Sequence, residues 1–139
     1  MAELARIGIA IPDDLLGEFD RLIEKRGYAT RSEAVRDLVR KELVDEISAS
    51  PNAEVYGTVT LIYDHHARLL LDKLTEIQHQ YHDAIMSSVH VHLDHDNCME
   101  VILVRGKSPS VEKLANSLIA TKGVKHGRFM LTTSGRNLP

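Results

Sequence analysis

Three side chains with metal-binding chemistry lie close together in one short stretch of the chain. His90 and His92 are two residues apart and alternate with apolar residues, which is the period-2 pattern of a half-buried strand. Residues two apart on a strand share a face, about 6.6–6.8 Å apart between Cα atoms, so two imidazoles can converge on one small ion. Residues 94–97 are typical of a tight turn, and a hairpin that places Cys98 opposite His92 would add a sulfur to that face. The alternating apolar residues are Val89, Val91 and Leu93.

Other interpretations of these residues stay open. A His-x-His pair is often a solvated strand face, and a lone cysteine is often a small buried hydrophobe. Three ligands also leave a coordination position, which His79, His82, a water or a residue of another chain could fill. Imidazole and thiolate suit zinc, copper, nickel and iron, and only the coordination geometry separates these metals.

The length, net charge and cysteine content of the chain limit the class of protein to which it can belong. Its 139 residues are enough for one ordinary domain or two small ones, and its net charge of −3 gives no field toward nucleic acid or an anionic membrane. No apolar run approaches the ~20 residues of a membrane span, and the N-terminus does not read as a signal peptide. A single cysteine forms no internal disulfide. We therefore expect a reducing, cytoplasmic location and no membrane partner.

Residues 1–50 predict one strand followed by two helices. A strand over residues 4–11 has one apolar face, made by Ile7, Ile9 and Ile11. Asp13 or Asp14 can cap a helix that ends at Gly27, and Thr30 with Glu33 forms a capping box for a second helix to about residue 47. The side chains expected to be buried on the second helix are Ala34, Val35, Leu38, Val39 and Leu43. Residues 48–53 are typical of a linker.

The single predicted strand of residues 4–11 has no partner within its own chain. Its backbone hydrogen bonds must be met elsewhere, and a unit this small hardly buries an adequate core. A two-fold dimer whose strands pair with each other solves both problems. Such a two-stranded ribbon can enter the major groove of DNA, and the start of the second helix can seat a phosphate.

Residues 54–139 predict the order βαββαβ, an antiparallel sheet with two helices on one face. The expected strands cover 55–64, 89–93, 98–106 and 124–131. One helix is expected within residues 67–86, and another in the segment from Ser108 to Gly123. Ser108 is expected as the N-cap, with Pro109 at N1. Val101 and Leu103 are expected to face the core. This is an α+β, ferredoxin-like arrangement. The helix residues expected in the core are Leu70, Leu74, Ile77, Tyr81, Val111, Leu114 and Leu118.

The whole chain resembles the NikR family of nickel-responsive transcriptional regulators. The resemblance rests on the order strand, helix, Gly-Tyr and capped helix with the sequence Arg-Ser-Glu-Ala-Val-Arg-Asp (31–37), and on His79, His90, His92 and Cys98. It implies a ribbon-helix-helix DNA-binding domain over residues 1–50. It also implies an ACT-like metal-binding and tetramerisation domain over residues 54–139. The implied assembly is a homotetramer, a dimer of dimers.

The resemblance also implies a metal site. His90, His92 and Cys98 of one subunit and His79 of a neighbour would hold one square-planar Ni(II) per chain. Tyr63 and Glu100 are expected to orient the ligands, because Glu100 shares the strand face of Cys98. A secondary hard-cation site is expected at Glu33 and Asp37, two carboxylates at i,i+4 on the second helix.

The expected DNA contacts follow from the same resemblance. The outward residues of the ribbon are Arg6, Gly8 and Ala10, and Arg6 can make a bidentate contact to guanine. Gly8 and Ala10 offer no side-chain hydrogen bond, so specificity for the operator should rest on Arg6, phosphate contacts and DNA shape. Arg31 and Ser32 at the start of the second helix are expected to contact phosphate.

The resulting prediction is a nickel-responsive regulator that represses nickel-uptake genes when Ni(II) is bound. One alternative is a ribbon-helix-helix regulator that answers zinc, copper or a small molecule such as an amino acid. A metal-dependent enzyme is disfavoured, because no carboxylate stands as a general base beside the cluster and four protein ligands leave no open position. A pure oligomerisation or antitoxin-type module, which would bind DNA without metal, is the last alternative.

Overall fold

The computed structural model describes residues 2–136 and 138–139 of the chain. The chain divides into two compact units, Met1–Lys41 and Glu42–Pro139. The helices α1 (Asp13–Lys25) and α2 (Arg31–Ala49) form the first part of the fold, and α2 continues into the second unit. None of the described helices is both long enough and apolar enough to cross a membrane.

Residues 2–12 carry no regular secondary structure. The strand predicted over residues 4–11 is therefore not formed in this chain by itself. The side chains of Ile7 and Ile9 are 76% and 64% exposed, although they belong to the predicted apolar face. The physical reason is that a strand exists only when its backbone groups pair with a neighbour, and this single chain offers the segment none.

Local signals set the bounds of α1 and α2. Gly27 has φ 82°, its N–H donates to Glu24 O at 3.0 Å, and the next N–H donates to Ile23 O at 3.0 Å. This pattern is a Schellman motif, which confirms the predicted glycine stop of α1. The N–H of Glu33 donates to Oγ1 of Thr30 at 3.1 Å, which confirms the Thr30 half of the predicted capping box.

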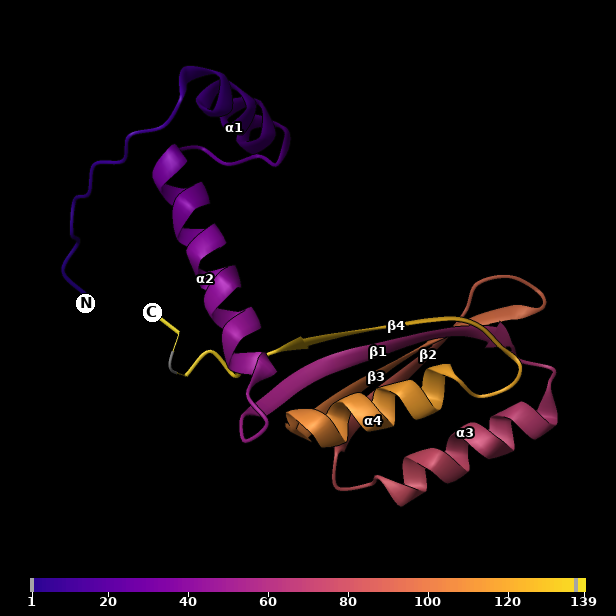
Figure 1. The fold of residues 1–139 in the computed structure, drawn as a ribbon. Coiled ribbons are helices and arrows are strands. Elements are labelled where there is room, and N and C mark those ends of the chain that lie inside the picture. Colours follow the sequence, from indigo (N-terminus) through magenta and orange to yellow (C-terminus); the bar gives the residue numbers. More distant parts are fainter. Residues whose placement is uncertain (1, 137) are drawn as a thin grey trace. The chain divides into compact units, whose positions relative to one another are not determined.

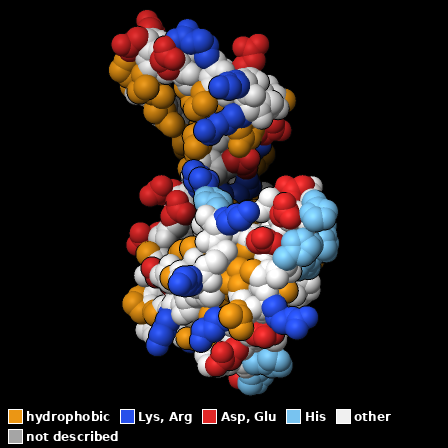
Figure 2. All heavy atoms as spheres, turned by 90° about the vertical axis from the view of Figure 1, so that its right-hand side faces the viewer, with side chains coloured by type: hydrophobic (Ala, Val, Ile, Leu, Met, Phe, Trp, Pro, Cys, Tyr) orange, Lys and Arg blue, Asp and Glu red, His pale blue; other side chains and the backbone are white. Residues whose placement is uncertain are grey.

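Two details of these helices differ from prediction. The N-cap of α1 is Pro12, so the two acidic residues expected as caps lie within the first turn. Their negative charges there stabilise the helix by interacting with the positive end of its dipole. On α2 only Ala34 is fully buried. Three large apolar residues expected in the core, Leu38, Val39 and Leu43, are exposed. Figure 2 shows hydrophobic side chains uncovered on the N-terminal unit.

The second unit is one antiparallel sheet with the strand order β2-β3-β1-β4. Helices α3 and α4 cover the same face of this sheet (Figure 1). The sequence therefore predicted the βαββαβ order correctly. The elements are β1 (Glu54–Asp64), α3 (Arg68–Gln80), β2 (Ile85–His92), β3 (Asn97–Lys107), α4 (Ser108–Ile119) and β4 (Val124–Thr132).

The core of this unit lies between the sheet and its two helices. Alternate residues of β1 and β3 point into it, and α4 contributes the predicted residues Val111, Leu114 and Leu118, all fully buried. Leu70, Leu74 and Ile77 of α3, on the same face of the sheet as α4, complete this core. This core is buried by residues of one chain, and each Å² of apolar area removed from water contributes about 25 cal/mol to its stability.

The face assignment predicted for the hairpin was wrong. The helix-covered face of β3 carries Cys98, Glu100, Ile102 and Val104, so Val101 and Leu103 lie on the open face. The apolar residues of β2 that pair with this strand are on the open face too. Both faces of β3 are apolar enough to be read as inward, and only the position of the helices decides between them.

Helix α3 lies within the predicted range of residues 67–86, whereas both ends of α4 differ from prediction. Helix α3 ends at Gln80, because the backbone of Tyr81 leaves the helical region at φ −114° and ψ 29°. Ser108 is the first residue of α4 and not its N-cap, and its Oγ donates to Ser48 O at 2.7 Å. Helix α4 ends at Ile119, four residues before Gly123 (φ 105°), which lies in the turn to β4.

Candidate metal centre

The hairpin of β2 and β3 sets the geometry of the candidate centre. His92 pairs with Cys98 and His90 pairs with Glu100 in an antiparallel register, which confirms the predicted pairing of His92 with Cys98. Directly paired residues share a face of the sheet. The two imidazoles, the sulfur and the Glu100 carboxylate therefore all belong to the helix-covered face.

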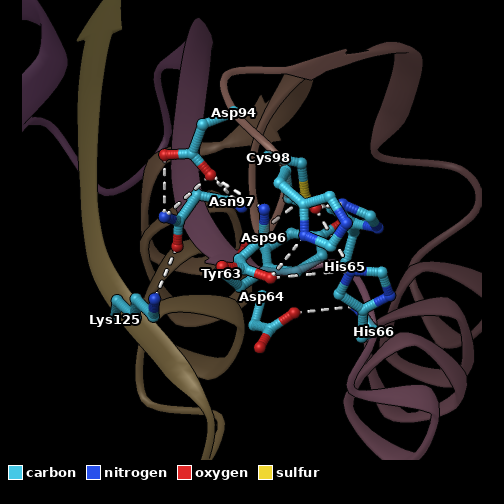
Figure 3. A network of polar contacts seen from close by, with 10 residues as sticks. Tyr63, Asp64, His65, His66, Asp94, Asp96, Asn97, Cys98 and Lys125 are labelled. Carbon is cyan, nitrogen blue, oxygen red and sulfur yellow. Dashed lines mark hydrogen bonds and ion pairs between the residues drawn. The ribbon is translucent and has the colours of Figure 1, made fainter.

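The turn before Cys98 is held by one carboxylate. Oδ1 of Asp94 accepts hydrogen bonds from the N–H of Asp96 at 2.9 Å and of Asn97 at 2.7 Å. Hydrogen bonds from the Asn97 side chain and from these backbone groups lower the pKa of Asp94 to about 2. Nζ of Lys125 donates to Oδ1 of Asn97 at 2.5 Å, which ties the turn to β4 (Figure 3).

The two hairpin histidines are exposed, and the cysteine is not. The ring centroids of His90 and His92 lie 5.4 Å apart at the edge of the sheet. Cys98 is fully buried, and its Sγ–H donates to Tyr63 O at 3.4 Å. Burial raises the pKa of the Cys98 thiol above its ordinary value. Without a cation nearby the sulfur therefore stays protonated at neutral pH.

A buried polar network supports one of the imidazoles. Tyr63 OH donates to Oε2 of Glu100 at 2.6 Å and lies 3.4 Å from Nδ1 of His90. Nε2 of Gln78, from α3, donates to Oε1 of Glu100 at 3.0 Å. Burial, followed by the hydrogen bond to Glu100, raises the pKa of Tyr63, so the phenol remains a donor. Each buried polar atom of Glu100 thus has a partner that fixes it.

His79 lies at the end of α3 and is exposed. It lines a cavity of about 550 Å³ together with His82 and His90. Within the described residues, however, only one trio of His, Cys, Asp or Glu brings its ligand atoms within 4.8 Å of one another, and that trio is His66, His95 and Asp96. One chain by itself therefore does not bring the four predicted ligands together.

His65, His66 and His95 were not singled out from the sequence. The ring centroids of His65 and His66 are 4.0 Å apart, those of His65 and His92 4.6 Å, and those of His66 and His95 5.5 Å. A signal was present, because His65 and His66 directly follow β1. The pairing of Tyr63 with Cys98 brings this end of β1 to the hairpin turn.

The residues expected to hold a second cation lie on one exposed face of α2. Oδ2 of Asp37 accepts a hydrogen bond from Tyr28 OH at 2.9 Å, and its Oδ1 accepts one from Nη1 of Arg40 at 3.1 Å. Glu33 is exposed one turn earlier. The Asp37 hydrogen bond raises the pKa of Tyr28. Asp37 therefore already has two donors as neighbours.

The residues expected to contact DNA are all exposed. Arg6, Gly8 and Ala10 lie in the irregular segment 2–12, and Ser32 lies in the first turn of α2. Nε and Nη2 of Arg31 each donate to Asp20 at 2.8 Å, a bidentate ion pair across the helix pair. The hydrogen bond from Arg31 lowers the pKa of Asp20. A phosphate that binds Arg31 must compete with this carboxylate.

Comparison with known protein families matches almost the whole chain. Residues 56–132 match the family described as the NikR C-terminal nickel-binding domain. Residues 5–46 match the family described as ribbon-helix-helix protein, copG family. The two matches cover the sheet with its helices and the helix pair with the segment before it.

Comparison with individual proteins agrees with the family matches. A protein of Solibacter usitatus named as a nickel-responsive regulator is 60% identical over 138 residues, which are 99% of either chain. One of Geobacter metallireducens with the same name is 56% identical over 138 residues, again 99% of either chain. Among solved structures, an uncharacterized protein from Thermotoga maritima aligns with a TM-score of 0.50 and 11% identity, covering 56% of this chain and 96% of that one. This last likeness concerns the fold alone.

Proposed function

The chain belongs to the NikR family of nickel-responsive, DNA-binding transcriptional regulators, and we propose that it represses nickel-uptake genes when Ni(II) is bound. It is a regulator and not an enzyme. The observation that carries the proposal is the register of His92 against Cys98, since it places two imidazoles and a thiol on one face of one hairpin.

The proposed ligands are His90, His92 and Cys98 of one chain with the partner subunit's His79, for one Ni(II) per chain. The donor set fits, because imidazole nitrogen and thiolate sulfur are ligands that Ni(II) accepts. The exposed rings can turn toward the buried sulfur, and a cation beside Cys98 favours the thiolate that burial disfavours. His79 is exposed on α3, where a neighbouring subunit could be reached.

Tyr63 and Glu100 are proposed to orient His90. The phenol lies 3.4 Å from Nδ1 of the imidazole and is itself fixed by the carboxylate at 2.6 Å. A ring whose Nδ1 is engaged in this way presents Nε2 to a metal. Glu33 and Asp37 are proposed as a secondary site for a hard cation, whose binding would displace at least one of the two donors that Asp37 now holds.

Operator DNA is the proposed partner of residues 4–11. The exposed apolar side chains of this segment and of α2 favour a two-fold dimer in which the segments of two chains pair as a ribbon. Arg6, Gly8 and Ala10 would then face the bases of the major groove. Arg31 and Ser32 would contact phosphate at the start of α2, with Arg31 exchanging Asp20 for a phosphate oxygen.

A homotetramer, built as a dimer of dimers, is the proposed assembly. In the sheet unit the open face exposes large apolar side chains, a feature typical of association surfaces. The proposed domains are residues 1–50 for DNA binding and residues 54–139 for nickel binding and tetramerisation. The proposed location is the cytoplasm. The exposed apolar residues of the open face are Val89, Val91, Leu103 and Met130.

The proposed switch is a linkage between the two ligands. Ni(II) can favour DNA binding only through a difference in its affinity for the DNA-competent and the other arrangements of the subunits. Coupling of this kind is typically about 1–3 kcal/mol, or about 5–150-fold in affinity. Copper should bind at least as tightly as nickel by the Irving–Williams order, so selectivity must come from geometry and metal availability. A zinc or copper response is the second candidate.

An anaerobic Ni(II) titration of the full chain tests the proposed metal site. A sulfur-to-nickel charge-transfer band that saturates with one bound ion is expected in the native chain and absent in Cys98→Ala. A band that survives in Cys98→Ala, or tight Zn(II) binding with no nickel band in the native chain, contradicts the proposal.

Operator binding tests the proposed DNA contacts. Arg6→Ala should abolish operator binding while nickel affinity is unchanged, because Arg6 belongs to the other unit of the chain. Lys113→Ala, an exposed cation on α4, is the matched control and should bind DNA as the native chain does. Normal operator affinity in Arg6→Ala contradicts readout by the ribbon.

A further inference from the structure

We propose a second, exposed site for a divalent transition-metal ion, formed by His66, His95 and Asp96. It is distinct from the hairpin site, because the two sites share no ligand. Its three members come from two loops, the one between β1 and α3 and the turn between β2 and β3. Neither the family match nor the hairpin pattern assigns a role to these side chains.

The distances within this trio suit a single small ion. Nδ1 of His95 lies 3.0 Å from Oδ1 of Asp96, and Nε2 of His66 lies 3.8 Å from the same oxygen. All three ligand atoms lie within 4.8 Å of one another. Ligands bound at about 2.0–2.2 Å to one ion are themselves about 3 Å apart. Small rotations of two exposed rings therefore close the site.

A backbone hydrogen bond joins the two loops that carry the trio: the N–H of His65 donates to Asp96 O at 3.0 Å. At the start of the first loop, the N–H of His66 donates to Oδ1 of Asp64 at 2.9 Å. On the other loop, Asp94 fixes the turn through the bonds described above. Figure 3 shows these contacts gathered at one end of the sheet. The backbone positions of the ligands are thus set before an ion arrives.

Charge and donor type narrow the class of ion. Two imidazole nitrogens and one carboxylate oxygen suit zinc, nickel or copper and not calcium or magnesium, which prefer oxygen. The carboxylates of Asp64, at the end of β1, and of Asp94, in the hairpin turn, add negative charge around the trio. The carbonyl oxygen of His95, 3.1 Å from Nε2 of His66, offers a further oxygen donor close by.

Exposure makes this site weaker than the hairpin site. The side chains of His66, His95 and Asp96 are 54%, 89% and 63% exposed, so their mutual attraction is screened by water. No thiolate is present in the trio. Ni(II) should therefore fill it after the hairpin site and without a sulfur charge-transfer band. The ring of His65 touches those of both His66 and His92, so the two sites are neighbours.

The test counts Ni(II) bound to the full chain by equilibrium dialysis with metal analysis, beside the absorption band of the sulfur site. The native chain should bind a second ion per chain with no further rise of the band. His66→Ala with His95→Ala should lose that ion and keep the band. Asp96→Asn, a conservative change, should weaken the second ion about tenfold or more, since one anionic ligand becomes neutral. His126→Ala, an exposed histidine on β4, is the matched control and should keep both ions.

Each contrary outcome overturns the second site. These outcomes are a single ion in the native chain, an unchanged count in the double variant, or loss of the second ion in His126→Ala. Cys98→Ala separates this proposal from the proposed function. It should lose the band and retain the ion held by His66, His95 and Asp96. If the band fails in the native chain, the hairpin assignment fails, and the effect of the double variant still decides the second site.

Discussion

The sheet unit of residues 54–132 and the segment of residues 2–12 differ in the burial of their apolar side chains. Leu61 of β1 and Leu114 and Leu118 of α4 are completely buried between the sheet and its helices. The side chains of Ile7 and Ile9 in the segment lie mostly in water. The difference shows where the chain is complete and where it depends on association. The core of the sheet unit is buried by residues of one chain, whereas burial of the segment needs a partner.

The largest effect is expected from a substitution in the exposed segment of residues 2–12. Ile9→Asp should raise the dissociation constant of the dimer about 100-fold or more, because two copies lose about 1.5–3 kcal/mol each of burial. Sedimentation across a dilution series measures it. Ala10→Ser, on the opposite face of the predicted strand, is the control and should leave the dimer intact. Equal dissociation in both variants would contradict the predicted ribbon.

A substitution in the core of the sheet unit should lower the free energy of unfolding to the same extent whether or not the chains associate. Leu114→Ala should lower the free energy of unfolding by about 2–5 kcal/mol, because it opens a cavity in a fully buried site. Leu69→Ala, at a side chain that is 86% exposed, should change it by less than about 0.5 kcal/mol. Denaturant unfolding at two protein concentrations gives both values. A strong concentration dependence of the Leu114→Ala loss would show that the sheet also needs a partner.

A smaller effect is expected from the buried network beside the hairpin. Tyr63→Phe removes the donor 2.6 Å from Glu100 and should reduce the free energy of unfolding by about 1.5–3 kcal/mol. It should also weaken Ni(II) binding about 10–100-fold, because His90 loses its support. Tyr56→Phe, whose hydroxyl lies 3.5 Å from Glu54, is the matched control. Unchanged nickel affinity in Tyr63→Phe would remove the phenol from the site.

The pH dependence of nickel binding follows from the buried thiol. Burial raises the pKa of Cys98, so the thiol is protonated throughout pH 6–8 in the metal-free chain. Binding as thiolate releases one proton, and the affinity should therefore rise about tenfold per pH unit as the pH increases. A competition titration with a chelator at several pH values measures the slope. A flat profile would exclude the sulfur as a ligand.

The smallest effect is expected from a substitution in the pair of helices α1 and α2. Asp20→Asn removes the carboxylate that holds Arg31 in a bidentate pair. The freed guanidinium should strengthen binding to DNA of unrelated sequence by up to about fivefold, with little change in stability. Glu18→Gln, which loses the i,i+3 partner of Arg21 on the same helix, is the control. Weaker DNA binding in Asp20→Asn would mean that the pair positions Arg31 for phosphate.

Sequence reasoning succeeded where one local pattern has one structural outcome. The glycine stop at Gly27, the capping box at Thr30, the βαββαβ order and the pairing of His92 with Cys98 all depend on neighbouring residues. Failures came where distant elements decide. The burial of Val101 depends on which face the helices cover. The strand over residues 4–11 was predicted to pair with a second chain, so it stays a prediction.

The trio of His66, His95 and Asp96 shows the same limit for sites. His66 lies 29 positions before His95, which is adjacent to Asp96, and the pairing of β1 with β3 brings the two loops together. The hairpin ligands could be predicted because two of them share one strand and the third follows a turn. Local spacing therefore identifies a site within one hairpin, whereas a site between loops needs the topology of the sheet.

The complete burial of Cys98 has a consequence for oxidative chemistry. Peroxides and alkylating reagents attack a thiolate far faster than a thiol, and they must reach the sulfur. In the metal-free chain the sulfur is both inaccessible and protonated, with its hydrogen directed at Tyr63 O. Residual sulfenic acid formation should therefore be slow. In its metal-free state, the regulator can thus keep its only cysteine reduced during oxidative stress.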